Sequence, residues 1–187
     1  IKAAAELITE EYPNYQYVAG NLINYHLRKM VYKGYNPLPA GLYSHIQAVV
    51  EEGYYDKNLL EIYNKEEWEE IEKFIVHDRD YNLTYAAMEQ WRGKYLVKNR
   101  VTNKFYETPQ VAYVLIAATL FSSYPKEERL KWVKDYYDAI SQFIISLPTP
   151  IMAGVRTDQR QYSSCVLIES DDSLDCLLYT SDAADDP

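Results

Sequence analysis

The sequence predicts a mainly α-helical protein in which β-structure is limited to one short hairpin and a strand near the C-terminal end. Apolar residues recur at helical spacing through most of the chain up to about residue 143. Glycine and proline interrupt this pattern where helices should begin or end. After residue 143 the composition becomes typical of strands, so the helices should come first and the strand last.

The first third of the chain has the signals of three helices. Residues 3–9 are rich in helix-forming residues, and Pro13 can stand in the first turn of a helix that runs to about Lys33. Residues 34–39 contain two prolines and one glycine, which favours a turn and a domain boundary. A third helix should follow and end at Gly53.

A capping pattern marks the next long helix. After a short helix at residues 59–63, Asn64 can cap a helix in which Glu67, three residues later, completes a capping box. Its buried stripe should contain Trp68, and the helix should end near His77.

A hairpin is expected before the last two long helices. Residues 84–91 have helical spacing, and Gly93 should terminate that helix. Residues 95–107 have β-rich ends around a polar centre, which predicts a hairpin. Pro109 and Pro125 can each open a helix, and these two helices should pack on each other.

The C-terminal segment changes character. In Leu147-Pro-Thr-Pro each proline favours extended geometry in the residue before it. Residues 161–169 (QYSSCVLIE) have the pattern of a buried strand. Residues 176–187 (CLLYTSDAADDP) then change composition abruptly and read like the in-frame translation of a transposon-based sequencing adaptor. We therefore exclude them from the fold prediction.

The composition excludes several classes of protein. The 187 residues carry a net charge of -9, which argues against a nonspecific nucleic-acid binder. No apolar run approaches the roughly 20 residues of a membrane helix, and we expect a cytoplasmic protein. Cys165 and Cys176 form neither a disulfide framework nor a Cys/His array, so no zinc site is predicted.

Cys165 is the strongest candidate for chemistry. A cysteine beside two hydroxyls, those of Ser163 and Ser164, can act as a thiolate or as half of a redox disulfide. Free cysteines are also among the most buried residues, so packing in a core is the alternative. The hydroxyls of Thr149 and Ser164 can donate to a phosphate or sugar, although such groups often bond to local backbone.

Charged groups supply weaker candidates. An acidic cluster near the C-terminal end can bind a divalent metal or sugar hydroxyls, but solvated loops and helix caps are the commoner role of such residues. The runs His26–Lys29 and His77–Asp80 are interpreted as charged helix ends. The acidic cluster consists of Glu169, Asp171, Asp172 and Asp175.

Several motifs together resemble one enzyme family. LPTPIMAGVRT at residues 147–157, SSCVLIE at 163–169 and DSL at 172–174 resemble the large (alpha) subunit of class I ribonucleoside-diphosphate reductase. Earlier motifs fit the same family in order: YPNYQYVAGNL, HLRK, HDRD, GKYLVKNRVT, FYET and YPKEERL. The resemblance extends from about Ala3 to Asp175.

The resemblance implies a division of the chain into domains. Residues 1–33 would be the C-terminal end of an ATP-cone regulatory module, and residues 34–158 would be the helical N-terminal domain. Residues 159–175 would carry the first strand of a truncated ten-stranded α/β barrel. Residues 176–187 would lie outside these domains as the adaptor artefact.

The resemblance also implies site residues. Thr149, Ser164 and Cys165 would contact the substrate nucleotide. Cys165 would also be one of two thiols that reduce the ribose 2′ position and end as a disulfide. The residues that bind allosteric effectors would be Asp172, Ser173, Leu174 and Lys29.

The implied enzyme reduces ribonucleoside diphosphates to deoxyribonucleotides, with ATP and deoxynucleoside triphosphates as effectors. This chain would bind no cofactor itself, because its radical would come from a dimetal beta subunit. Thioredoxin or glutaredoxin would supply electrons, and the full-length alpha subunit would form a homodimer. The second redox thiol and the Asn-x-Cys-x-Glu motif of the radical cysteine are absent from this sequence. We therefore expect the fragment alone to be inactive.

Two other interpretations stay open. One is a non-catalytic helical module that binds nucleotides or subunits and in which Cys165 has only a structural role. The other is a reductase of another class, such as the cobalamin-dependent one.

Overall fold

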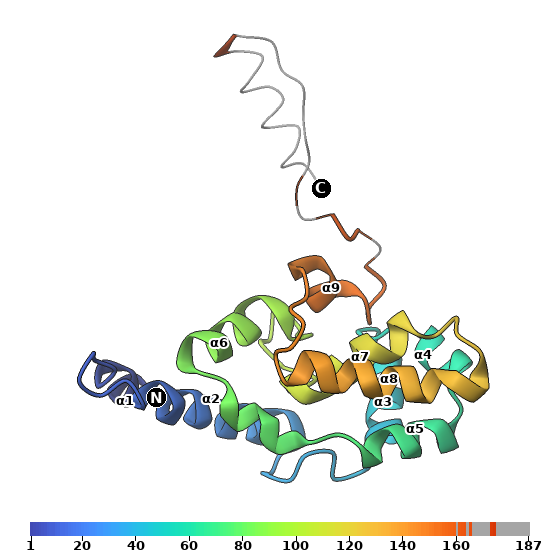
Figure 1. The fold of residues 1–187 in the computed structure, drawn as a ribbon, viewed down its shortest axis with the longest axis horizontal. Helices are drawn as coiled ribbons and strands as arrows, with labels where there is room; N and C mark the ends of the chain where they lie inside the picture. Colours follow the sequence, from blue (N-terminus) through green and yellow to red (C-terminus); the bar gives the residue numbers. More distant parts are fainter. Residues whose placement is uncertain (160, 164, 166–172, 175–187) are drawn as a thin grey trace.

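The computed structural model describes residues 1–159, 161–163, 165 and 173–174 (Figure 1). Within these residues there are helices and no strand, which confirms the mainly helical prediction. The α-helices are α1 (Lys2–Glu6), α2 (Tyr15–Tyr32), α3 (Leu42–Glu51), α4 (Asn58–Ile62), α5 (Lys65–Lys73), α6 (Tyr85–Gln90), α7 (Pro109–Leu120), α8 (Lys126–Ser141) and α9 (Thr149–Gly154), with a 3-10 helix η1 (His77–Asn82) and a π-helical turn η2 (Trp91–Tyr95).

Helix α7 forms the centre of the body. Every residue from Pro109 to Ala118 is buried, because α8, α9 and η1 pack around the helix (Figure 1). A helix that is apolar on all sides is expected to lie in the interior. Its first residue is a proline, whose missing N–H group costs nothing at that position. The expected packing of α7 against α8 is confirmed.

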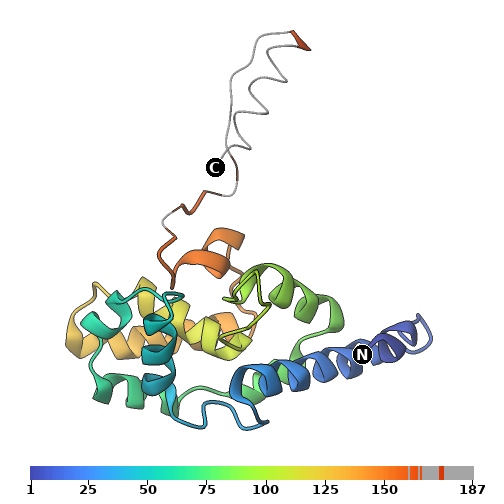
Figure 2. The ribbon, with the colours of Figure 1, turned by 180° about the vertical axis from the view of Figure 1, so that it is seen from behind.

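The N-terminal helices project from one side of this body. Figures 1 and 2 both show α1 and the start of α2 extending away from α7 and α8. α2 also packs on α6, and Gly20 in its first half allows the close approach of the segment just before α6. A Cβ atom there would lie 2.4 Å from the carbonyl oxygen of Leu83. Any side chain at this position would push the two elements apart.

The capping prediction for α5 is confirmed. The Asn64 side chain accepts a bond from the Glu67 amide at 2.9 Å, and the Glu67 carboxylate accepts one from the Asn64 amide at 3.1 Å. Trp68 is fully buried, as the stripe predicted. The helix ends at Lys73, earlier than the predicted end near His77, and His77 instead begins η1.

The expected hairpin at residues 95–107 is reduced to a single antiparallel bridge between Lys98 and Phe105. Three hydrogen bonds to side-chain acceptors explain the short pairing. The amide of Val97 donates to the Glu107 carboxylate at 2.8 Å, and the Asn99 side chain accepts bonds from the loop amides at 2.9 Å. Side-chain acceptors thus replace part of the strand ladder.

Three other local predictions are corrected. Gly93 does not end a helix but lies inside the π-helical turn η2. Thr149 is not extended, because it begins α9, although Pro148 before it is extended with ψ 151°. The predicted strand at residues 161–169 falls mostly outside the described residues, and the described Cys165 has irregular backbone. Among the described helices none combines the length and apolar character needed to cross a membrane.

Candidate functional site

Helix α9 carries the first predicted site residue and lies where the chain leaves the helical body (Figure 1). Thr149 is its first residue and is exposed, while Met152 and Gly154 face the interior. The helix has only six residues and no side-chain cap. Such a short helix is not stable on its own, so tertiary contacts must hold it in place.

The main anchor of α9 is Arg156, whose side chain is fully buried. Its Nε donates to the two carboxylate oxygens of Glu107 at 2.8 and 3.1 Å, and its Nη2 contacts the same carboxylate. Its remaining donors reach the carbonyl oxygens of Met152 at 2.7 Å and Tyr95 at 2.8 Å. Burial by itself would lower the pKa of Arg156, but the Glu107 carboxylate outweighs it and raises that pKa.

Glu107 extends the same network to two more segments. Its carboxylate accepts the Tyr55 hydroxyl at 2.7 Å and the Val97 amide at 2.8 Å. Burial, and then the charge of Glu107, raise the pKa of Tyr55, which stays a neutral donor. The carbonyl of Arg156 also accepts the Asp56 amide at 3.0 Å. This ion pair therefore joins α9 to η2, to the 97–107 loop and to the chain after α3.

A groove of about 520 Å³ lies beside α9. One wall is formed by Pro150, Ala153 and Gly154, and the other by η2 and the residues after it. Lys94, Lys98, Arg100 and Asp158 are the charged residues of its lining.

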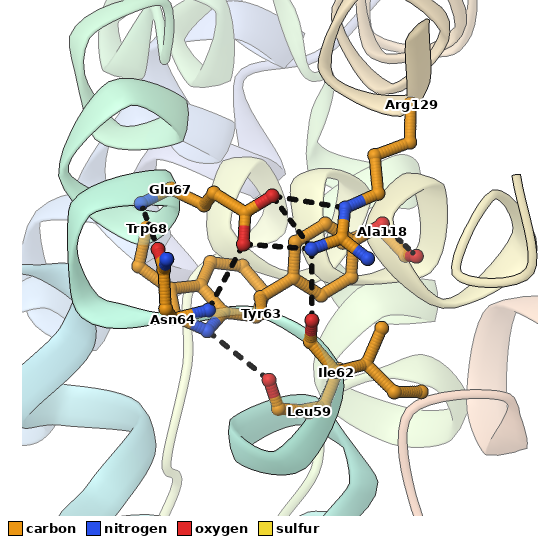
Figure 3. Close-up of polar contacts among 8 residues, drawn as sticks. All are labelled: Leu59, Ile62, Tyr63, Asn64, Glu67, Trp68, Ala118 and Arg129. Atoms are coloured by element: carbon orange, nitrogen blue, oxygen red, sulfur yellow. Dashed lines mark hydrogen bonds and ion pairs between the residues drawn. The ribbon is translucent and has the colours of Figure 1, made fainter. Parts of the chain in front are cut away.

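A second buried Arg–Glu pair, Arg129 with Glu67, lies between α8 and α5 (Figure 3). Arg129 of α8 donates to Glu67 of α5 with distances of 2.6 to 3.0 Å, and to the carbonyl of Ile62 at 2.8 Å. The Tyr63 ring lies 4.3 Å from the guanidinium carbon of Arg129. Burial by itself would raise the pKa of Glu67, but the bonds from Arg129 and the Asn64 amide hold it below its usual value. The pair ties α5 to α8.

A third buried charge cluster lies between α2, η1 and α7. Arg28 donates to the carbonyl of His77 at 2.7 Å, and its Nη2 lies 3.9 Å from Asp80, which is fully buried. Gln110 donates to Asp80 at 3.0 Å. Burial raises the pKa of Asp80 to about 7 against these partners, and burial together with Arg28 lowers the pKa of His77 to about 4. The interpretation of both runs as charged helix ends was thus wrong for Arg28 and Asp80.

The predicted site residues are only partly described. Thr149 and Cys165 are both exposed, and Lys29 is an exposed residue in the last turn of α2. Ser173 and Leu174 are exposed, while Ser164 and Asp172 lie outside the described residues. Nowhere in the described part of the chain do His, Cys, Asp and Glu gather into a possible metal site.

Neither Glu107 nor Arg156 was predicted from the sequence, although both are central to the geometry around α9. One signal could have found Glu107, since it is the only charged residue between Lys104 and Pro125. A charge in such an apolar stretch is expected to be paired.

Comparisons with known proteins decide the family. The family model described as "Ribonucleotide reductase, all-alpha domain" matches residues 81–160. "Ribonucleoside-diphosphate reductase 1 subunit alpha" of Escherichia coli (strain K12) is 57% identical over 183 residues, which are 98% of this chain and 24% of that relative. The chain belongs to the ribonucleotide reductase alpha-subunit family.

The similarity extends to distant members of this family. The alpha subunit of ribonucleoside-diphosphate reductase from Enterobacteria phage T4 is 48% identical over 93% of the chain, and that from Synechocystis sp. (strain ATCC 27184 / PCC 6803 / Kazusa) is 32% identical over 95%. The chain spans about a quarter of the length of these relatives, with shares of 22% to 24%. The residues that match the ribonucleotide reductase family model include Glu107 and Arg156 but not Glu67.

Proposed function

We propose that this chain is part of an alpha subunit that reduces ribonucleoside diphosphates to 2′-deoxyribonucleoside diphosphates by a radical mechanism with a redox dithiol. The observation that carries this proposal is the 57% identity with an enzyme of that name over 98% of the chain. The mainly helical fold fits the matched all-alpha domain. The alternative of a helical module without catalysis finds no comparable support.

The substrate contacts in this proposal are Thr149, Ser164 and Cys165. Cys165 is one of two thiols that become a disulfide while the 2′ carbon of the ribose is reduced. The exposure of Thr149 and Cys165 supports these roles, because both side chains must reach a ligand. The effector contacts are Asp172, Ser173, Leu174 and Lys29, and the exposure of Lys29 is compatible with an effector contact.

The proposed partners follow from the same family. A dimetal beta subunit supplies the radical, thioredoxin or glutaredoxin supplies electrons, and two alpha subunits form a dimer in the cytoplasm. Residues 1–33 belong to the regulatory ATP cone, 34–158 to the helical domain and 159–175 to the barrel. The fragment is inactive by itself. We also propose that residues 176–187 derive from a sequencing adaptor, which adaptor-free genomic reads across these codons test directly.

The decisive experiment uses the full-length alpha subunit with its beta subunit. The enzyme is expected to convert cytidine diphosphate to its deoxynucleotide with thioredoxin. Cys165→Ser should abolish this turnover with thioredoxin, because serine cannot form the disulfide. Unchanged turnover in that variant would reject the redox role and favour a structural Cys165. Turnover that needs cobalamin and no beta subunit would assign the enzyme to the other reductase class.

A further inference from the structure

We propose that Arg156, held by Glu107, is a positioning residue that fixes α9 and thereby places Thr149 against the substrate. The inference rests on the proposed function, since it assigns Thr149 to the substrate site. It goes beyond that function because neither Arg156 nor Glu107 is among the ligand contacts proposed above.

The bonds of Arg156 are arranged to fix the orientation of α9 as well as its position. The guanidinium bonds to the carbonyl of Met152 in α9, four residues earlier in the chain, and to the carbonyl of Tyr95 in η2. The carbonyl of Arg156 accepts the Asp56 amide. Side chain and backbone of one residue therefore hold the end of α9 from different directions.

The partners of Glu107 make this anchor rigid. The carboxylate is fully buried and accepts bonds from Tyr55 and Val97 in addition to those from Arg156. Because its acceptor sites are used by separate segments, it cannot shift without breaking several bonds. An arginine on such an acceptor loses little conformational entropy per hydrogen bond, because its planar guanidinium can form two parallel bonds with one carboxylate.

Lysine cannot reproduce this arrangement. Arg156→Lys keeps the positive charge next to Glu107, but a lysine ammonium is a single point of donors on a flexible stem. It cannot bond to Glu107, Met152 and Tyr95 together in the arginine's geometry. α9 should then lose its fixed orientation while the buried carboxylate stays neutralised.

Arg129→Lys is the matched control. Arg129 forms an equally bidentate pair with Glu67, is buried, and bonds to a carbonyl, but its hydrogen bonds go to Glu67 and Ile62 rather than to α9. Both variants make the same chemical change in a buried pair. A loss of activity that follows only from general destabilisation should therefore occur in both.

The test measures steady-state reduction of cytidine diphosphate by the full-length enzyme, well below the unfolding midpoint of each variant. Arg156→Lys is expected to lower kcat/KM by about 100-fold, mainly through a higher KM, because small misplacements of a binding group have effects of this size. Arg129→Lys should keep the wild-type kcat/KM. Thr149→Ala combined with Arg156→Lys should lose little more than Thr149→Ala alone, since both changes act on one contact.

Two outcomes would overturn the positioning role: an unchanged KM in Arg156→Lys, or losses that simply multiply in the double variant. Should Arg156→Lys fail to fold, Tyr55→Phe removes only one hydroxyl from Glu107 and should raise KM in the same direction by a smaller factor. An unchanged KM in Tyr55→Phe would then reject the proposal. If the wild-type enzyme itself fails to reduce the substrate, the proposed function is what fails.

Discussion

The two buried Arg–Glu pairs use the same chemistry for different purposes. In the Glu67–Arg129 pair, both side chains keep some contact with solvent, at 8% and 9% exposure, and the carboxylate also closes a capping box. The Glu107–Arg156 pair has no exposure at all and bonds to loops and to the end of α9. The Glu67–Arg129 pair joins two helices that a cap or their own length already stabilises. The Glu107–Arg156 pair orders segments that have little secondary structure of their own.

This difference indicates where a buried ion pair affects more than stability. Helices α5 and α8 would keep their shape without their salt bridge, because they are longer and α5 is capped. α9 and the 97–107 loop lack such local support. A buried pair does not guarantee net stability, since burial of both charges costs free energy. Its clearest effect is to make one arrangement of the surrounding backbone more favourable than others.

The largest expected effect comes from breaking each pair in turn. Arg156→Met leaves Glu107 as a buried charge without its cation and should lower the free energy of unfolding by about 3–5 kcal/mol. Arg129→Met should cost less, because Glu67 can still be reached by water. Urea unfolding of both variants measures the difference. Equal losses of unfolding free energy would show that the slight exposure of the Glu67–Arg129 pair does not change its contribution to stability.

The Arg28–Asp80 cluster is a third case, because the Arg28 guanidinium lies 3.9 Å from the Asp80 carboxylate and forms no bidentate bond with it. Burial raises the pKa of Asp80 to about 7, from about 3.8 in the unfolded chain. The folded state then holds a proton that the unfolded state releases. The contribution of Asp80 to stability is therefore lost as the pH rises from about 4 to about 7, by at most about 1.4 kcal/mol per pH unit.

Asp80→Asn isolates this effect. His77 acts in the opposite direction, since its pKa of about 4 in the folded state makes stability rise with pH between about 4 and 6.5. Because His77 is present in both proteins, its effect cancels in the difference between wild type and variant. The free energy of unfolding is measured in urea at several pH values for both proteins. The difference between them should shift in favour of the variant as the pH rises to about 7. A difference independent of pH would mean that Asp80 is ionised throughout.

The smallest effect should come from the cap beside Glu67. Asn64→Ala removes the side-chain acceptor of the Glu67 amide but leaves the Arg129 pair intact, and should cost about 1 kcal/mol. Thr84→Ala at the start of α6, where the hydroxyl accepts the Ala87 amide at 3.3 Å, is the control without an ion pair. If Asn64→Ala costs as much as Arg129→Met, the cap and not the pair is the main support of α5.

The sequence was sufficient for helices whose ends have local signals. Pro109 and the Asn64–Glu67 box lie at the predicted starts of α7 and α5, because caps and prolines act within a few residues. The hairpin was overestimated since residue patterns do not show that Glu107 takes the amide of Val97. The turn η2 was missed because Gly93, which elsewhere ends helices, here lies in a wider helical turn.

The site residues also fall into two groups, those that motifs in the sequence indicate and those that only the fold reveals. The motifs supplied Thr149 and Cys165 through their resemblance to a family, without any geometry. Arg156 and its acceptor are 49 residues apart in sequence, and Arg129 and Glu67 are 62 apart. No local pattern joins such partners. Only the fold shows that the charges in HLRK and HDRD meet in the interior, because neither motif by itself differs from a solvated helix end.

Hydrogen exchange at the amides of α9 measures directly whether Arg156 holds this helix in place. In Arg156→Lys, the amides of Met152 to Arg156 should exchange much faster than in wild type, while those of α7 and α8 keep their rates. In Arg129→Lys, the α9 amides should exchange at the wild-type rate. Equal protection of α9 in wild type and Arg156→Lys, or equal loss of protection in both variants, would show that Arg156 does not specifically fix α9.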